Sequence, residues 1–283
     1  MTVDGKALAH ELRGELKKRV AQFSLDAPPS LLVIVTQESR VTKSYISLKE
    51  KVAEELGIRF ARFQLDVFGG TEDVVHEILH GARTHDGIVV QLPLVRTVEE
   101  NAIKHIMPIT HDVDVYGETA WAQYREGHLP ILPPVVGAIS DILHHNSLTV
   151  TGQKVVVVGD GWLVGKPAAV WAERMGAESV TVITKESNNR VGPLKDADLI
   201  ISGAGHPGLI TPDLVKEGVI ILDAGTSEAN GKLAGDVDPA VAEKARLMTP
   251  VPGGIGPVAI TRLFDNLLTL KELREGVDPR LTD

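Results

Sequence analysis

A single lysine lies among apolar residues in the segment 44–57. On a helix, at about 100° per residue, Lys49 shares one face with Tyr45 and the apolar side chains of Leu48, Val52, Ala53 and Leu56. An ammonium group in such a place must snorkel, pair, or occupy a cleft where burial lowers its pKa toward values useful for proton transfer. Snorkelling is the ordinary interpretation of such a lysine. The tyrosine one turn earlier on the same face favours a ligand site instead.

Two further segments carry polar groups suited to the same site. Gln91 ends the apolar run 87–90, which predicts its amide at the carboxyl edge of a sheet, where α/β proteins bind ligands. A glutamine that satisfies loop backbone is the alternative. Asp112 and Asp114 alternate, so in an extended chain their carboxylates share one face. That spacing also fits a turn or a metal site, but no neighbouring His/Glu pair at helical spacing completes a ligand set.

Two glycine-rich segments predict close approach of the backbone to a ligand. The apolar run 155–158 leads into the turn 159–167, and a strand followed by such a turn and a helix offers backbone NH groups to phosphate. The spacing Gly-x-Gly-x-x-x-Gly departs from the common fingerprint, so a plain tight turn stays an alternative. The segment 249–257 contains three prolines and three glycines, which indicates a shaped loop.

Composition narrows the class of protein. The 283 residues are 43% hydrophobic and carry a net charge of −9, which argues against a broad nucleic-acid or membrane surface and favours small-molecule ligands. The chain has no cysteine, which excludes disulfides and thiolate metal sites. No apolar run approaches the roughly 18 residues of a membrane span, and we expect a cytoplasmic protein.

The elements that must hold these groups alternate between strand and helix. We expect two α/β domains, with a linker at 121–134. Helical spacing is expected at 4–23, 45–56, 74–82 and 258–270, and strands at 31–35, 58–65, 87–92, 154–158, 180–183, 199–202 and 219–223.

Together these residues resemble the bifunctional methylenetetrahydrofolate dehydrogenase/methenyltetrahydrofolate cyclohydrolase family. Six family motifs occur in the same order across nearly the whole chain: 45–49, 90–94, 112–114, 164–167, 235–237 and 250–257. The resemblance implies two α/β domains around a cleft, in a homodimer. Residues 1–133 would be the catalytic folate-binding domain, joined by a C-terminal helix at 258–283, and residues 134–257 the Rossmann-like nucleotide-binding domain.

The resemblance also implies roles. In the catalytic set Lys49 would be the general acid/base for methenyl hydrolysis, Gln91 would hold it, Tyr45 would stack on the aminobenzoyl ring and Asp114 would accept hydrogen bonds from the pterin. The folate pocket would be walled by Pro252, Gly253 and Gly254. No metal is implied. The dinucleotide would contact Gly159, Asp160, Gly161, Val164, Gly165, Thr184, Lys185 and Thr226.

Departures from the family pattern concentrate near the dinucleotide. The frequent Gly-Arg-Ser is replaced by Gly159-Asp160-Gly161, and a carboxylate there would repel the 2′-phosphate of NADP. The frequent His-Ser is replaced by Thr184-Lys185, where Lys185 would restore a positive charge. We therefore expect NADP or NAD, with NAD favoured. In addition, Val115 follows Asp-Val-Asp where glycine is usual.

The expected activity is NAD(P)-dependent oxidation of 5,10-methylenetetrahydrofolate and hydrolysis of the methenyl product to 10-formyltetrahydrofolate. Three alternatives stay open. They are a cyclohydrolase with weak or no dehydrogenase activity, a folate- or nucleotide-binding protein without turnover, and an enzyme of a related one-carbon carrier.

Overall fold

The computed structural model describes residues 1–229 and 232–277 and contains two compact units. The three-stranded unit comprises residues 11–134 and the chain from residue 260 onward, and the five-stranded unit comprises residues 1–10 and 135–259. The predicted boundaries at 133/134 and 257/258 stay predictions. The end of the expected C-terminal helix, 278–283, lies outside the described residues.

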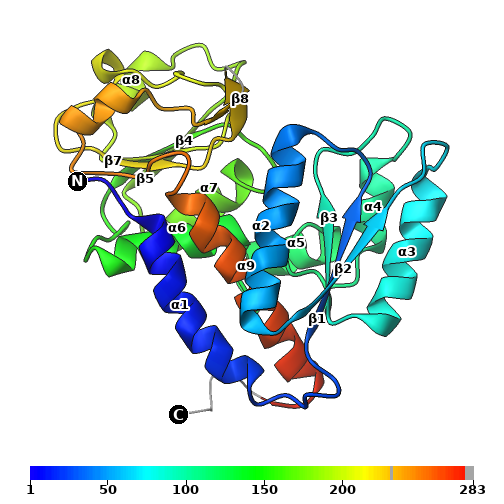
Figure 1. Ribbon diagram of the computed structural model, residues 1–283. Coiled ribbons are helices and arrows are strands. Elements are labelled where there is room, and N and C mark those ends of the chain that lie inside the picture. The colour runs from blue at the N-terminus through cyan, green and yellow to red at the C-terminus, as the bar shows by residue number, and fades with distance from the viewer. Residues whose placement is uncertain (230–231, 278–283) are drawn as a thin grey trace. The chain divides into compact units, whose positions relative to one another are not determined.

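The three-stranded unit is built on a parallel sheet with strand order β2-β1-β3 (Figure 1). The central strand is buried along its whole length, as its sequence Ser-Leu-Leu-Val-Ile-Val suits a strand covered on both faces. The elements of this part of the chain are β1 (Ser30–Val35), α2 (Arg40–Leu56), β2 (Arg59–Gln64), α3 (Thr71–Thr84), β3 (Gly87–Gln91), α4 (Glu100–Ile106) and α5 (Glu118–Glu126), preceded by α1 (Gly5–Val20), whose first residues, up to residue 10, belong to the five-stranded unit.

The five-stranded unit has a parallel sheet of order β10-β7-β6-β4-β5 and a small antiparallel pair, β8-β9. Its core packs apolar residues of the sheet, including Val156, Ile200 and Ile221, against the flanking segments. Its elements are α6 (Pro134–His145), β4 (Lys154–Val158), α7 (Gly165–Arg174), β5 (Ser179–Ile183), α8 (Val191–Asp196), β6 (Leu199–Ser202), η1 (Pro212–Leu214), β7 (Ile220–Asp223), β8 (Ser227–Ala229), β9 (Lys232–Ala234), η2 (Pro239–Glu243) and β10 (Leu247–Met248). The helix α9 (Ile255–Arg274) begins in this unit and continues from residue 260 in the three-stranded unit.

The predicted alternation of strands and helices is confirmed, with two corrections. The linker expected at 121–134 is wrong in its first half, because 121–126 belongs to α5, whose Ala120 and Tyr124 are buried. The glycine and prolines that suggested a linker fall after that helix, where Gly127 ends it with φ 81°. The helices α4 and α6 were not placed from the sequence.

Two features are absent from the described part of the chain. None of its helices is long and apolar enough to cross a membrane. None of its groups of His, Asp or Glu side chains is placed to hold a metal ion.

Candidate functional site

Lys49 lies in the middle of α2 and is almost completely buried. The helix begins after Ser39, whose hydroxyl accepts a hydrogen bond from the Thr42 NH, and ends at Gly57 with φ 74°. Only 6% of Lys49 is exposed, and its Nζ donates a hydrogen bond of 2.8 Å to Gln91 Oε1. A snorkelling lysine would reach solvent, so that interpretation is excluded.

Gln91 is the last residue of β3, at the carboxyl edge expected from the sequence, in register with Val35 of the central strand. Its Nε2 donates to the carbonyl of Leu92 at 3.1 Å, which leaves Oε1 for Lys49. The amide therefore makes both the backbone contact named as the alternative and the contact with Lys49 that the family resemblance implies. It satisfies loop backbone and holds the lysine.

Burial and charge oppose each other at Lys49 and Asp114. Desolvation lowers the pKa of Lys49, and the negative charge of Asp114 acts against that change. Desolvation likewise raises the pKa of Asp114, opposed by the charge of Lys49. Both groups are thus shifted toward their neutral forms, which suits a lysine that exchanges a proton.

Asp112 and Asp114 have different surroundings. The Asp112 carboxylate accepts hydrogen bonds from the NH groups of Tyr116 at 3.0 Å and Gly117 at 2.7 Å, so it shapes the loop. Burial raises its pKa to about 6 despite these bonds. Directly after Asp114, Val115 has φ 56°, the left-handed conformation that glycine adopts readily. The backbone here keeps a shape suited to glycine although the side chain is valine, at a cost of about 1–3 kcal/mol.

The apolar face predicted for α2 is mostly confirmed. Val52, Ala53 and Leu56 are buried beside Lys49, and Tyr45 is half-buried one turn earlier. Leu48 was wrongly placed on this face, since 37% of it is exposed. Ile46, which the sequence argument omitted, is buried instead. A face drawn at 100° per residue has uncertain edges, and Leu48 and Ile46 lie at those edges.

In the five-stranded unit the turn after β4 is shaped by glycines. Gly159 has φ 96°, and its NH donates to the Ile183 carbonyl at 2.8 Å. A Cβ on Gly165 would lie 2.0 Å from the Gly159 carbonyl oxygen, so only glycine lets α7 begin this close to the strand. Asp160 and Gly161 are exposed at the tip of the turn. Val164 fills the space that a Cβ on Gly203 would need, at 2.4 Å.

The other predicted dinucleotide residues follow β5 and β7. Thr184 donates its hydroxyl hydrogen to Glu186 Oε2 at 2.8 Å. The Lys185 side chain is 88% exposed, and its Nζ lies 3.7 Å from Glu186 Oε1. Thr226 is exposed after β7. Because β4, β5 and β7 are parallel members of one sheet, the turns that follow them lie along one edge.

The loop with Pro252, Gly253 and Gly254 belongs to the five-stranded unit. Gly253 has φ 105°, which favours glycine. A Cβ on Gly5, the first residue of α1, would lie 1.9 Å from the Gly254 carbonyl oxygen, so the loop packs tightly on the start of that helix. This close packing fixes the loop's shape within its own unit.

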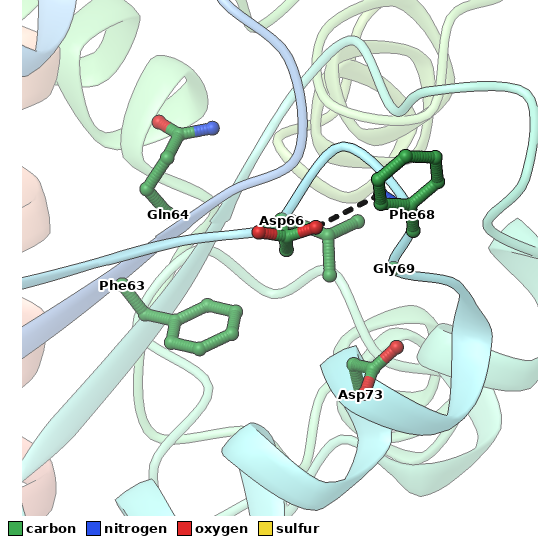
Figure 2. Close-up of a pocket in the computed structure, with 7 residues that line it drawn as sticks. Phe63, Gln64, Asp66, Phe68, Gly69 and Asp73 are labelled. Atoms are coloured by element: carbon green, nitrogen blue, oxygen red, sulfur yellow. Dashed lines mark hydrogen bonds between the residues drawn. The ribbon is translucent and has the colours of Figure 1, made fainter.

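A pocket of about 320 Å³ lies at the end of β2, and none of its lining residues is a predicted site residue. Figure 2 shows Asp66 accepting a hydrogen bond from the Phe68 NH, at 3.0 Å, with the Phe68 ring beside it. Phe68 is 97% exposed. The pocket is lined by Phe63, Gln64, Leu65, Asp66, Phe68, Gly69 and Asp73.

Sequence reasoning missed one buried polar cluster. Asp223 and Asp236 lie in the five-stranded unit with Ser202 and Thr249, joined by hydrogen bonds. In the sequence, Asp236 stands out only as part of the motif 235–237. The available signals were an acidic residue at the end of the apolar run 219–222 and another directly after Gly235.

Comparison with known proteins supports the resemblance along the whole chain. The family model for the catalytic domain of tetrahydrofolate dehydrogenase/cyclohydrolase matches residues 3–114, and that for its NAD(P)-binding domain matches residues 133–275. The chain is 36% identical to the bifunctional protein FolD of Staphylococcus aureus over 98% of both chains.

Solved structures of proteins from this family are similar to the chain along nearly its whole length. A bifunctional methylenetetrahydrofolate dehydrogenase/cyclohydrolase, FolD, from Campylobacter jejuni is 30% identical, with a TM-score of 0.91 over 97% of this chain and 99% of that one. A Trypanosoma brucei enzyme of the same kind, in complex with NADP and an inhibitor, is 29% identical, with a TM-score of 0.90 over 97% and 98%.

These findings confirm the predicted two-domain α/β class, with a catalytic and an NAD(P)-binding domain. They also confirm the predicted enzyme class, an oxidoreductase and hydrolase of one-carbon folates. The chain belongs to the tetrahydrofolate dehydrogenase/cyclohydrolase family.

Proposed function

We propose that the chain oxidises 5,10-methylenetetrahydrofolate with NAD(P)⁺ and hydrolyses the 5,10-methenyl product to 10-formyltetrahydrofolate. The observation that carries this proposal is the buried Lys49 Nζ, hydrogen-bonded to Gln91 at 2.8 Å and shifted toward its neutral form. A lowered pKa makes the ammonium a stronger acid, which is easier to deprotonate than that of a solvated lysine and therefore suits proton exchange.

Hydrolysis follows from that proton exchange. Lys49 takes a proton from water as the water oxygen bonds to the methenyl carbon. It then returns the proton to N5 of the folate as the bond from that carbon to N5 breaks. The remaining hydroxyl proton is released, which leaves a formyl group on N10. Gln91 keeps the amine oriented because its oxygen accepts one N–H of Lys49.

Substrate binding would use the neighbours of Lys49. Tyr45, one turn earlier on α2, offers a ring for stacking on the aminobenzoyl group. Asp114 offers a carboxylate to the pterin amino edge, and its charge also acts on Lys49. Pro252, Gly253 and Gly254 would contribute the wall assigned to them by the family resemblance.

The residues after β4 fit a dinucleotide. A Gly159 turn that opens α7 presents backbone NH groups at a helix start, the usual site for a pyrophosphate. Bound NAD(P)⁺ would accept hydride directly from the methylene carbon, so the protein needs only to orient the two partners. The other predicted contacts, Asp160, Gly161, Val164, Gly165, Thr184, Lys185 and Thr226, are proposed to surround it.

The dinucleotide preference is proposed as NAD over NADP. Asp160 is exposed at the tip of the turn, where its charge repels an added 2′-phosphate. Lys185 acts the other way, but it is largely exposed and lies near Glu186, whose charge offsets its own.

The wider assignments are proposals too. We propose a catalytic domain at 1–133 with the C-terminal helix, a nucleotide domain at 134–257, a cytoplasmic location without nucleic-acid or membrane partners, and a homodimer. The dimer is supported by β2, which lies at the edge of its sheet and leads to the exposed Val67 and Phe68. Light scattering of the purified chain, with cell fractionation, tests the last two points.

An absorbance assay tests the central proposal. The purified chain is given methenyltetrahydrofolate alone, then methylenetetrahydrofolate with NAD⁺ or NADP⁺ in separate reactions. We expect hydrolysis in the first and dinucleotide reduction in the second. Hydrolysis without reduction would leave only a cyclohydrolase, and binding of folate without either reaction would leave a binding protein.

A further inference from the structure

Two buried carboxylates lie in the five-stranded unit and take no part in the chemistry of Lys49. Asp223 is the last residue of β7, and Asp236 follows β9 by two residues. Asp236 is 0% exposed. Burying a carboxylate is costly unless donors surround its oxygens, so the identity of those donors indicates what the group stabilises.

The donors to Asp236 come from the end of β6 and the loop that follows it. Ser202 donates its hydroxyl hydrogen at 2.6 Å, and the NH groups of Ala204 and His206 donate at 2.7 Å each. Because the NH groups of Ala204 and His206 both point to the same carboxylate, the backbone 203–206 curves around it. Hydrogen bonds to a charged acceptor of this kind are about twice as strong as neutral ones.

Asp223 fixes the backbone on which Asp236 lies. Its carboxylate accepts from the NH groups of Gly225 at 2.9 Å, Asp236 at 3.2 Å and Val237 at 3.0 Å. The two carboxylates also occupy space that two glycines leave open. A Cβ on Gly225 would lie 2.2 Å from Asp236 Cγ, and one on Gly235 would lie 2.1 Å from Asp223 Oδ2.

The wrapped loop lies where a parallel α/β sheet binds its ligand. In the order β10-β7-β6-β4-β5, the chain runs from β4 to one side and then returns to the other, so the switch point lies between β4 and β6. The loop 203–206 leaves β6 at that point and touches the Gly159 turn. A Cβ on Gly159 would lie 2.9 Å from the Gly203 carbonyl oxygen.

We propose that Asp236, supported by Asp223, is a positioning residue that holds the loop 203–206 against the Gly159 turn in the shape that receives the dinucleotide. The inference rests on the proposed dehydrogenase function and adds a residue that acts through backbone shape, without contact to the cofactor. Asp236 should therefore affect the binding of NAD⁺ and of NADP⁺ equally, whereas a residue that contacts the 2′-phosphate would affect only NADP⁺.

Asp236→Asn tests this because it keeps the size of the side chain but replaces one acceptor oxygen by an NH₂ group that faces donors. We expect the Kd of both NAD⁺ and NADP⁺, measured by calorimetry, to rise roughly tenfold to a hundredfold. Methenyl hydrolysis should keep the parental rate, because it uses Lys49 and no dinucleotide. A residue that only stabilised the fold would change both.

Asp238→Asn is the matched control. Asp238 lies two residues further on and caps η2 by accepting from the Ala240 NH, a role that asparagine performs equally well. The Asp238→Asn variant should bind both dinucleotides with the affinity of the parent. Ser202→Ala removes one of the three donors to Asp236 and should raise both Kd values by a smaller factor, roughly twofold to tenfold.

Unchanged dinucleotide affinity in folded Asp236→Asn would overturn the proposal, as would equal losses of dinucleotide binding and hydrolysis. If Asp236→Asn does not fold, unchanged affinity in Ser202→Ala overturns it. A parent protein that hydrolyses the methenyl substrate but binds neither dinucleotide would contradict the dehydrogenase part of the proposed function itself. That outcome is seen with the parent protein alone, so failure of the proposed function can be told apart from failure of the role given to Asp236.

Discussion

The two units hold their buried charges in different ways. In the three-stranded unit, Lys49 is held by one side-chain amide and lies within the field of one opposite charge, Asp114. In the five-stranded unit, Asp223 and Asp236 have like charges and are held mostly by backbone NH groups. The first arrangement leaves N–H groups of the amine available to a substrate. The second uses both carboxylates to fix the backbone.

The difference suggests a division of roles: the buried lysine takes part in the reaction, whereas the buried carboxylates fix the shape of a loop. A group that must gain and lose a proton needs few fixed partners and a pKa shifted toward neutrality. A carboxylate that shapes a loop needs a hydrogen-bond donor for each of its oxygens. If the contrast is correct, substitutions in the first unit change reaction and substrate, whereas those in the second change dinucleotide affinity.

The largest expected effect is that of Lys49→Met. Loss of the proton-transfer group should lower methenyl hydrolysis by about two to four orders of magnitude while folate binding and the fold stay largely intact. Lys51→Met, on the same helix but exposed, is the control and should retain parental activity. Hydrolysis at the parental rate in Lys49→Met would show that another group moves the proton.

Asp114→Ala should weaken folate binding more than dinucleotide binding. Loss of a charge-assisted hydrogen bond costs about 1.5–3 kcal/mol, roughly one to two orders of magnitude in affinity. Calorimetric titration with folate and with NAD⁺ measures both. Asp112→Asn should instead lower thermal stability, because Asp112 accepts from two loop NH groups. Equal losses for both ligands in Asp114→Ala would remove the assigned pterin contact.

Asp160→Arg should shift the dinucleotide preference toward NADP. Reversing a charge at the exposed tip of the Gly159 turn should change the ratio of kcat/KM for NADP⁺ and NAD⁺ by roughly tenfold, the scale of close charges in a solvated site. Both cofactors are assayed on parent and variant. A parent that strongly prefers NADP⁺, or a variant whose ratio does not change, contradicts the role of Asp160.

The last expected effect is on stability instead of activity, and it is a dependence of the free energy of unfolding on pH. Burial, followed by the charge of Asp236, raises the pKa of Asp223 from 3.8 to about 6 against three NH donors that lower it. Between these values the folded chain binds more protons than the unfolded chain, so this contribution to stability, about 3 kcal/mol at most, decreases as pH rises. The difference in Tm between the parent and Asp223→Asn should be larger at pH 5 than at pH 7.5. A constant difference would place the pKa of Asp223 near its ordinary value.

The sequence predicted the parts of the site that follow from periodicity. An isolated charge on an apolar helical face identified Lys49, and the end of an apolar strand located Gln91. It did not separate Asp112 from Asp114, because their difference depends on a left-handed turn at Val115 that alternation cannot reveal. Nor did it find the Asp223–Asp236 cluster. Those carboxylates are partnered by NH groups of other segments, and backbone donors leave no pattern of residue types.

The reciprocal fit of the two carboxylates with Gly225 and Gly235 also constrains how this corner can change over generations. Each glycine is small because a carboxylate fills the place of its missing methyl group, and that carboxylate comes from the other end of the same short segment. A methyl group at Gly225 is excluded while Asp236 stays, and removal of Asp236 alone leaves donors without an acceptor. A change at one position of a pair therefore alters the fit at the other, so the two positions of each pair are sterically coupled.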